Sequence, residues 1–310
     1  MRRWDNLVDQ YIEEYFARGI NPATIDNVRR ELDRLGAWLK SRRPKPRLET
    51  ITSDLLIEYI KVRSAFKSKS TIYGSVSRMR GMGDFLVRQK VWSSNPLRWI
   101  QGPKVTPYHR MPKRISGQDM QSIWDAAANA GTPFTSQKWI TVLALLYGTG
   151  IRRGELARLK LTDWSPSTSI ITIDGRKTGM QRNVPVPELV SQCINSYLPF
   201  RYNFLETRQR VNTDTLFVNS EGEPIREDSI SNGVHRIAKR AGVKLHSLHQ
   251  FRHTCASDLL ESGVCMAQVQ MVLGHQHLST TMRYTHIADP KRHEAVACHP
   301  LNDWLLQEAC

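Results

Sequence analysis

The sequence predicts a mainly α-helical protein with one small β-hairpin or sheet, built as two folded units. Apolar residues recur at helical spacing along most of the 310 residues. One stretch, "SIITIDGRKTGMQRNVPVP", alternates apolar and polar residues on either side of a turn, as a hairpin does. A proline-rich basic stretch near residue 100 separates two helical parts.

The first unit is expected to be a small bundle of four helices with little strand character. Their expected ranges are about 4–18, 22–40, 53–62 and 70–91. Asn21 precedes the second helix, Ser53 or Asp54 is expected to cap the third, and Ser70 the fourth. The composition then changes to a linker.

Residues 95–114 hold four prolines within a basic stretch and are expected to be extended. We place a helical domain at 1–100, the linker proper at 101–114 and a second domain at 115–310. The linker cations Lys104, Lys113 and Arg114 suit a phosphate backbone, but a plain solvated connection explains them equally well.

The second unit is expected to be helical around its hairpin. Helices are expected at about 116–130, 138–147, 154–159, 187–208, 227–241, 247–262, 266–273 and 279–287. The chain ends in an amphipathic tail, "HPLNDWLLQEAC".

The charge balance favours a polyanionic partner such as duplex DNA. Lys plus Arg number 44 against 29 Asp plus Glu, a net charge of +15. Residues 1–105 hold 21 basic and 11 acidic residues, so +10 lies there and 23 − 18 = +5 in the remainder. A concentrated positive field attracts nucleic acid, although net charge also serves solubility.

Other bulk features point to a cytoplasmic protein. No run approaches the ~18 apolar residues that a membrane helix needs, and the first residues lack the pattern of a signal peptide. The five cysteines form no C-x-x-C pair and are expected to be reduced thiols without a role.

Four fragments of the second unit carry residues suited to phosphoryl transfer. They are "YGTGIRRGEL" with Arg152, Arg153 and Glu155, "GRKTGMQR" with Arg176 and Lys177, "LHQFRHT" with His249 and Arg252, and "LGHQHLSTTMRYTH" with His275 and Tyr284. Arginines bind phosphate oxygens, lysine and histidine exchange protons, and tyrosine attacks phosphorus. Each fragment alone is a weak signal, and the combination is specific.

In this order, the fragments resemble the tyrosine recombinase (phage integrase) family, and the chain is similar in style to its short Xer-type bacterial members. Residues 145–185 resemble the first family signature and 246–287 the second. The helical first unit resembles the family's core-binding, SAM-like domain. The resemblance extends over essentially the whole chain and implies a two-domain DNA clamp.

Position by position, the resemblance implies roles for individual residues. The implied catalytic residues are Arg152, Lys177, His249, Arg252, His275 and the nucleophile Tyr284, with Glu155 supporting them. Candidates for DNA contact are Arg153, Arg176, Arg182, Lys104, Lys113 and Arg114. The implied site uses neither a cofactor nor a metal.

The resemblance also implies an assembly and a reaction. Four protomers act on two duplex DNA sites and exchange strands in pairs through a 3′-phosphotyrosyl intermediate and a Holliday junction. The tail, with Leu301, Trp304, Leu305 and Leu306, is expected to dock on a neighbouring protomer, and packing on its own domain is the alternative. Accessory DNA-binding proteins or a partner recombinase are further possible partners.

Three rival functions fit parts of the pattern. His249 and His253 have the spacing of a zinc-binding helix, but Gln250 stands where a metalloprotease has its glutamate. A non-catalytic DNA-binding regulator explains the charge but not the ordered set of residues. A type IB topoisomerase shares the active-site design, and the compact first unit favours a recombinase. The sequence predicts neither the DNA site nor whether the task is integration, transposon movement or dimer resolution.

Overall fold

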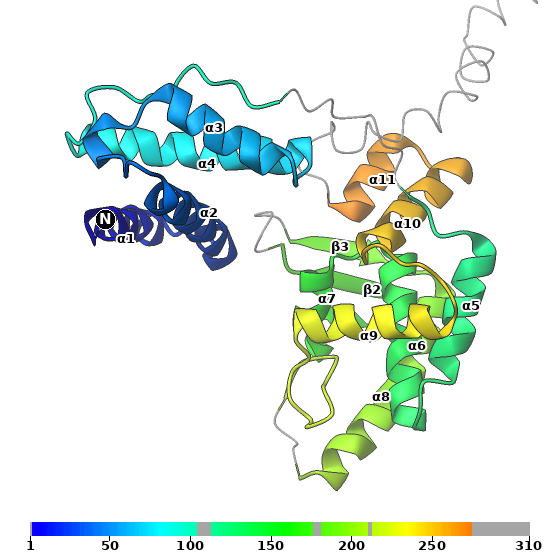
Figure 1. The fold of residues 1–310 in the computed structure, drawn as a ribbon. Helices are drawn as coiled ribbons and strands as arrows, with labels where there is room; N and C mark the ends of the chain where they lie inside the picture. Colours follow the sequence, from blue (N-terminus) through cyan, green and yellow to red (C-terminus); the bar gives the residue numbers. More distant parts are fainter. Residues whose placement is uncertain (1, 104–112, 176–180, 210–212, 275–310) are drawn as a thin grey trace, which may run out of the picture. The chain divides into compact units, whose positions relative to one another are not determined.

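The computed structural model describes residues 2–103, 113–175, 181–209 and 213–274, drawn as a ribbon in Figure 1. The chain divides into two compact units, 1–109 and 110–310. Helices dominate both, and the described residues hold one three-stranded antiparallel sheet. The predicted fold class is confirmed. Within the described residues, no helix is both long and apolar enough to cross a bilayer.

The first unit contains the four expected helices. They are α1 (Arg2–Ala17), α2 (Pro22–Ser41), α3 (Ser53–Ser64) and α4 (Lys69–Arg88), with a short 3₁₀ turn η1 (Leu48–Thr50) between α2 and α3. Their apolar faces share one core that includes Val8, Leu32, Leu56 and Leu86. The periodicity therefore predicts both the number and the type of these elements.

Two helix starts in this unit differ from the prediction. The hydroxyl of Thr52, not a side chain of Ser53 or Asp54, accepts the N–H of Leu55 and caps α3. Ser68 caps α4 by accepting the N–H of Thr71. Each cap lies upstream of the expected residue, because several adjacent polar residues suit the role and only the backbone geometry selects one.

Residues 95–100 are not extended, so that part of the linker prediction is wrong. They form a turn that folds back on α4 and buries Leu97. The Asn95 amide donates to the carbonyl of Arg80 at 3.0 Å, and the Arg80 guanidinium donates to the carbonyl of Ile100 at 2.6 Å. The prolines do not reveal this burial. The boundaries proposed around 101–114 stay predictions.

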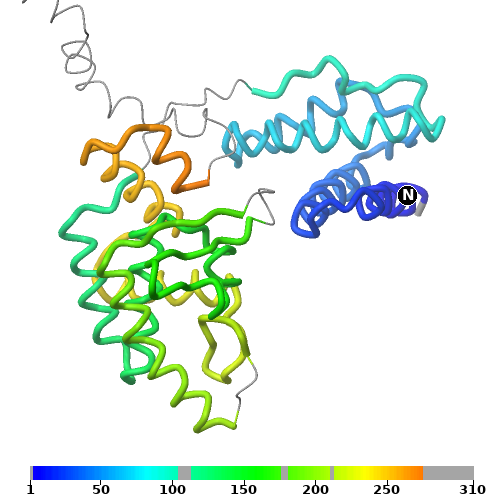
Figure 2. The backbone as a smooth tube through the Cα atoms, turned by 180° about the vertical axis from the view of Figure 1, so that it is seen from behind, coloured from blue at the N-terminus to red at the C-terminus, as the bar shows by residue number. Residues whose placement is uncertain are grey.

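The second unit surrounds the apolar helix α6 (Pro133–Gly148). The other helices are α5 (Gly117–Ala128), α7 (Arg153–Arg158), α8 (Glu188–Thr207), α9 (Glu227–Arg240), α10 (His249–Glu261) and α11 (Met266–Leu273). In Figures 1 and 2, α6 and α8 run side by side. Because α6 is buried along most of its length, it is the central support of this unit.

The predicted hairpin is confirmed and extended by a third strand. Strand β2 (Ile170–Ile173) pairs antiparallel with β3 (Arg182–Pro185), and Ile173 lies opposite Arg182. The unpredicted β1 (Trp164–Ser165) follows the 3₁₀ turn η2 (Leu161–Asp163) and joins β2. Two residues are too few for an alternating pattern. Residues 176–180 at the hairpin tip lie outside the described residues.

Candidate active site

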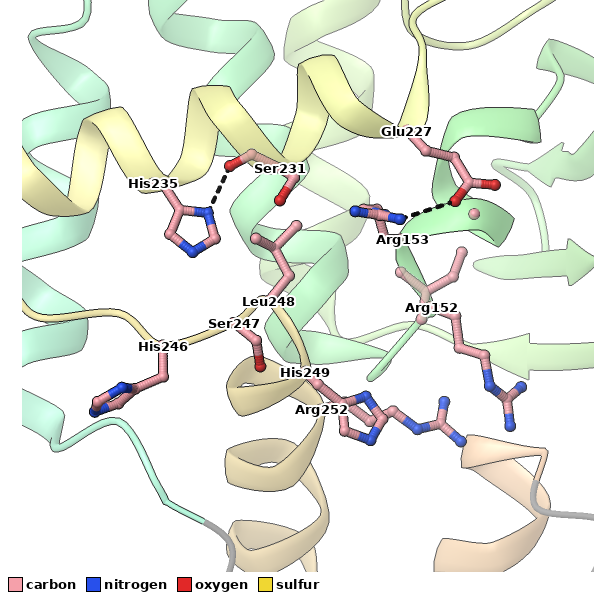
Figure 3. Close-up of a pocket in the computed structure, with 12 residues that line it drawn as sticks. Arg152, Arg153, Glu227, Ser231, His235, His246, Ser247, Leu248, His249 and Arg252 are labelled. Carbon is pink, nitrogen blue, oxygen red and sulfur yellow. Dashed lines mark hydrogen bonds and ion pairs between the residues drawn. The ribbon is translucent and has the colours of Figure 1, made fainter. Parts of the chain in front are cut away.

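A pocket of about 460 Å³ in the second unit brings together the three predicted catalytic residues that the structure describes, Arg152, His249 and Arg252. It is lined by the start of α7, one face of α9 and the start of α10. Figure 3 shows Arg152, His249 and Arg252 meeting there, although about 100 residues separate the two arginines. Of the other predicted catalytic residues, Lys177, His275 and Tyr284 lie outside the described residues.

Arg152 is fixed by a carboxylate three residues later in the chain. It stands just before α7, and Glu155 occupies the position where a glutamate reaches back to the N-terminal backbone. One Glu155 oxygen accepts the Arg152 N–H at 3.0 Å, and the other accepts the Arg152 guanidinium at 2.8 Å. The local sequence "RRGE" therefore orients the Arg152 side chain toward the pocket.

Arg182, from β3, reaches the same carboxylate. Its two terminal nitrogens donate to the Glu155 oxygens at 3.2 and 2.9 Å. The two side chains are 10% and 5% exposed, so this ion pair is nearly dry. Burial alone would raise the pKa of the Glu155 carboxyl, but the hydrogen bonds and charge of Arg182, with the bonds from Arg152, outweigh it and lower the pKa to about 2.

Arg252 is buried on α10 and held by backbone carbonyls. Its guanidinium donates to the carbonyl of Gly150 at 2.7 Å and to that of Leu273 at 2.6 Å. Gly150 has a φ of +58°, and a Cβ there would lie 2.4 Å from the Leu273 side chain. The glycine of "TGIRR" thus permits both the turn and the close approach of α11.

His249 begins α10 and lies on the Arg252 face of that helix, three residues earlier. Its ring packs edge-on against that of His253, with 4.5 Å between the ring centroids. No cluster of three or more metal-ligating side chains occurs among the described residues. The pocket is also lined by His235 and His246, to which the sequence patterns assign no role.

The predicted DNA-contact residues have different surroundings. Arg153 forms ion pairs with Glu227 and Asp228 at the pocket rim. Arg114 forms ion pairs with Asp258 and Glu261 on α10. In both clusters the opposite charges partly neutralise one another, so a phosphate would compete with carboxylates at either arginine.

Two further candidates for DNA contact, Lys113 and Arg182, have other surroundings. Lys113 lies exposed, with its ammonium 3.0 Å from the His246 ring nitrogen. Arg182 is largely covered by the protein and paired with Glu155, instead of lying at the surface as a DNA contact would. Lys104 and Arg176 lie outside the described residues. Roles in DNA contact stay predictions for all of these side chains.

Known protein families match both units of the chain. Residues 113–291 match the phage integrase family, and residues 8–90 match the phage integrase N-terminal SAM-like domain. The tyrosine recombinase XerC of Listeria monocytogenes serovar 1/2a is 33% identical over 236 residues, covering 76% of this chain and 77% of the relative. XerD of Halalkalibacterium halodurans is 27% identical over 97% of this chain and 99% of its own.

Solved structures share the fold. The XerH recombinase in a post-cleavage complex on difH DNA has a TM-score of 0.73 at 20% identity, covering 91% of this chain and 81% of its own. The Tn1549 transposon integrase bound to transposon right-end DNA has a TM-score of 0.72 at 18% identity, covering 94% and 99%. With the family match spanning more than half its length, the chain belongs to the phage integrase family of tyrosine recombinases.

Proposed function

We propose that this protein is a site-specific DNA recombinase that cleaves and rejoins duplex DNA through a 3′-phosphotyrosyl intermediate. The observation that supports this most is the meeting of Arg152, His249 and Arg252 at one pocket. Two guanidinium groups there suit the non-bridging oxygens of one phosphodiester. Glu155 holds Arg152 in place without cancelling the site's charge, because Arg182 compensates the carboxylate.

In the proposed cleavage step, the hydroxyl oxygen of Tyr284 attacks the phosphorus of a DNA phosphodiester. A bond forms between phosphorus and the tyrosine oxygen while the bond to the 5′ oxygen breaks, which leaves a free 5′ hydroxyl. Lys177 donates the proton to that oxygen, and His249 and His275 assist in taking the tyrosine proton. Arg152 and Arg252 stabilise the charge that builds on the other two oxygens.

Rejoining is the same step in reverse with a different strand. A 5′ hydroxyl from the partner DNA attacks the phosphotyrosine, and the tyrosine leaves. One phosphoester bond is made for each one broken, so the exchange itself needs no external energy source. The proposal therefore includes no ATP.

The proposed assembly is four protomers on two DNA sites, exchanging strands through a Holliday junction. A structural relative with a TM-score of 0.66, the lambda integrase, was solved as a tetramer bound to such a junction. The two units of each protomer would hold the duplex as a clamp, and the tail after Tyr284 would dock on a neighbour. Accessory proteins or a second recombinase belong to the proposal as further partners, with the cytoplasm of a bacterial cell as its location.

Covalent trapping tests the proposal and also identifies the DNA site. The purified protein is incubated with a library of nicked random duplexes, so that the short strand diffuses away after cleavage. Adducts that survive denaturant are recovered and sequenced. We expect one enriched sequence, and two copies of it on a plasmid should recombine.

The matched variant is Tyr284→Phe, which removes only the attacking oxygen. It should bind the enriched duplex with unchanged affinity and form no adduct. An adduct from this variant, or plasmid relaxation without any exchange between two sites, would contradict the proposal.

A further inference from the structure

Two of the last four carbonyls of α11 accept hydrogen bonds from arginines. The last four carbonyls of a helix have no partner within it. The Gly274 N–H takes up those of Gln270 and Met271. The carbonyl of Val272 accepts from Arg182 at 3.2 Å, and the carbonyl of Leu273 accepts from Arg252 at 2.6 Å.

The next carbonyl along the chain continues the series. Gly274 accepts from the Arg152 guanidinium at 3.0 Å. Three consecutive carbonyls, 272 to 274, thus receive one hydrogen bond each from three arginines that come from β3, α10 and the residue before α7. Positive charge is favourable at this end of a helix, where the backbone dipoles are negative.

Arg182 is the member of this set that joins the helix end to Glu155. Its Nε donates to Val272, and its two other nitrogens donate to the Glu155 carboxylate. Every guanidinium nitrogen therefore has a partner inside the protein. Arg182 is 10% exposed, against 29% for the Arg152 side chain, so Arg152 is the better placed of the two for a phosphate.

Arg182 also packs directly on the turn that ends α11. Gly274 has a φ of +64°, and a Cβ there would lie 2.8 to 2.9 Å from three atoms of the Arg182 side chain. Packing against Gly274 and the hydrogen bond to Val272 thus both hold Arg182 at the C-terminal end of α11. The residues that follow Gly274, including His275 and Tyr284, lie outside the described residues.

We propose that Arg182 is a positioning residue of the recombination reaction, acting through Glu155 and the Val272 carbonyl. It holds Arg152 and the C-terminal end of α11 in a fixed position relative to each other. The phosphate-binding arginines and Gly274, the last residue before the segment that leads to Tyr284, therefore keep a fixed separation. The inference rests on the proposed recombinase function. It assigns Arg182 no contact with DNA, which changes the role expected from the sequence.

The test uses the full-length protein on the trapped DNA sequence, with the variants Arg182→Gln and Arg182→Lys. At saturating DNA, Arg182→Gln should form the adduct roughly 10–100-fold more slowly, the usual effect of losing a residue that orients an active-site group. Arg182→Lys keeps the charge and should recover part of the rate. The dissociation constant for DNA and its dependence on salt should not change in either variant.

Two controls separate positioning from direct contact and from loss of folding. Loss of a phosphate contact would reduce the slope of log affinity against log salt by about one. Arg201→Gln removes another buried arginine, one that donates to the carbonyls of Thr213 and Thr215 and to no other acceptor in the described part of the chain. It should lower the melting temperature and leave the rate of adduct formation per folded molecule unchanged.

The outcomes are distinct. A wild-type rate in Arg182→Gln overturns the inference, as does a loss of affinity with a smaller salt slope. If Arg201→Gln slows adduct formation as much as Arg182→Gln, the effect is one of stability and the inference is also overturned. If the wild-type protein forms no adduct with any DNA, the proposed function itself fails.

Discussion

Glu155 carries a negative charge where little water reaches it. An isolated buried carboxylate would become neutral, but two arginines donate to its oxygens and keep it ionised. The groups that face it are Arg152 on its own side of the pocket and Arg182 from β3. The position of Arg152 therefore depends on the ionised state of Glu155.

This arrangement predicts a specific pH dependence of stability. The pKa of folded Glu155 is about 2, below its ordinary value of 4.5. The stabilisation is thus complete above about pH 4.5 and is lost as the pH falls toward 2. A shift of this size corresponds to about 3 kcal/mol. Urea unfolding at pH 6, 5, 4 and 3 should show the free energy of unfolding of the wild type falling more steeply than that of Glu155→Gln; parallel curves would refute the assignment.

Single residues also show how far a sequence predicts a site at this scale. Short patterns identify Arg152, Glu155, His249 and Arg252, and the structure places them in or beside one pocket. The same patterns predict a DNA contact for Arg182, because a basic residue on a hairpin is usually exposed. Its actual partners, Glu155 and Val272, are 27 and 90 residues away in the chain, and no local pattern reports such contacts.

At the scale of elements, the end of α11 is the critical junction. The helix has only eight residues, and its end is held by arginines from three other segments. Hydrophobic periodicity predicts all the described α-helices of the second unit. It does not predict which residue caps a helix, because a cap depends on a single hydrogen bond. Nor does it predict the two-residue strand β1, which depends on pairing with β2.

Two glycines with similar positive φ angles provide a matched test of this junction. Gly274 and Gly242 have φ angles of +64° and +71°, but a Cβ meets Arg182 only at Gly274 and nothing within 4 Å at Gly242. Gly242→Ala should cost about 1 kcal/mol, the strain of the left-handed backbone alone. Gly274→Ala should cost more and also slow adduct formation. Thermal unfolding and trapping assays compare them, and equal effects of the two variants would count against the junction.

At the scale of the whole molecule, the two units differ in net charge and in whether they contain the pocket. The first 105 residues carry +10 of the net charge of +15, while the pocket lies in the second unit. Composition predicts the uneven charge, and the four sequence fragments predict that the site lies in the second unit. Neither predicts the fold of residues 95–100, because the burial of Leu97 depends on α4 and not on its own neighbours.

The clamp proposed for these units predicts a steep dependence of binding on salt. If each protomer contacts about ten phosphates, log affinity should fall against log salt concentration with a slope of roughly −9. Fluorescence anisotropy with the enriched duplex, between 50 and 300 mM salt, measures this slope. A value near zero would exclude a clamp built on charge.

The identity of the nucleophile is the central claim, and mass spectrometry of the trapped adduct tests it most directly. Trypsin cuts after Arg283 and Lys291, which releases the peptide "YTHIADPK" with Tyr284 as its only tyrosine. After digestion of the DNA, this peptide should carry the added mass of one nucleotide 3′-phosphate on Tyr284. Finding the nucleotide on any other residue, with this peptide unmodified, would contradict the mechanism.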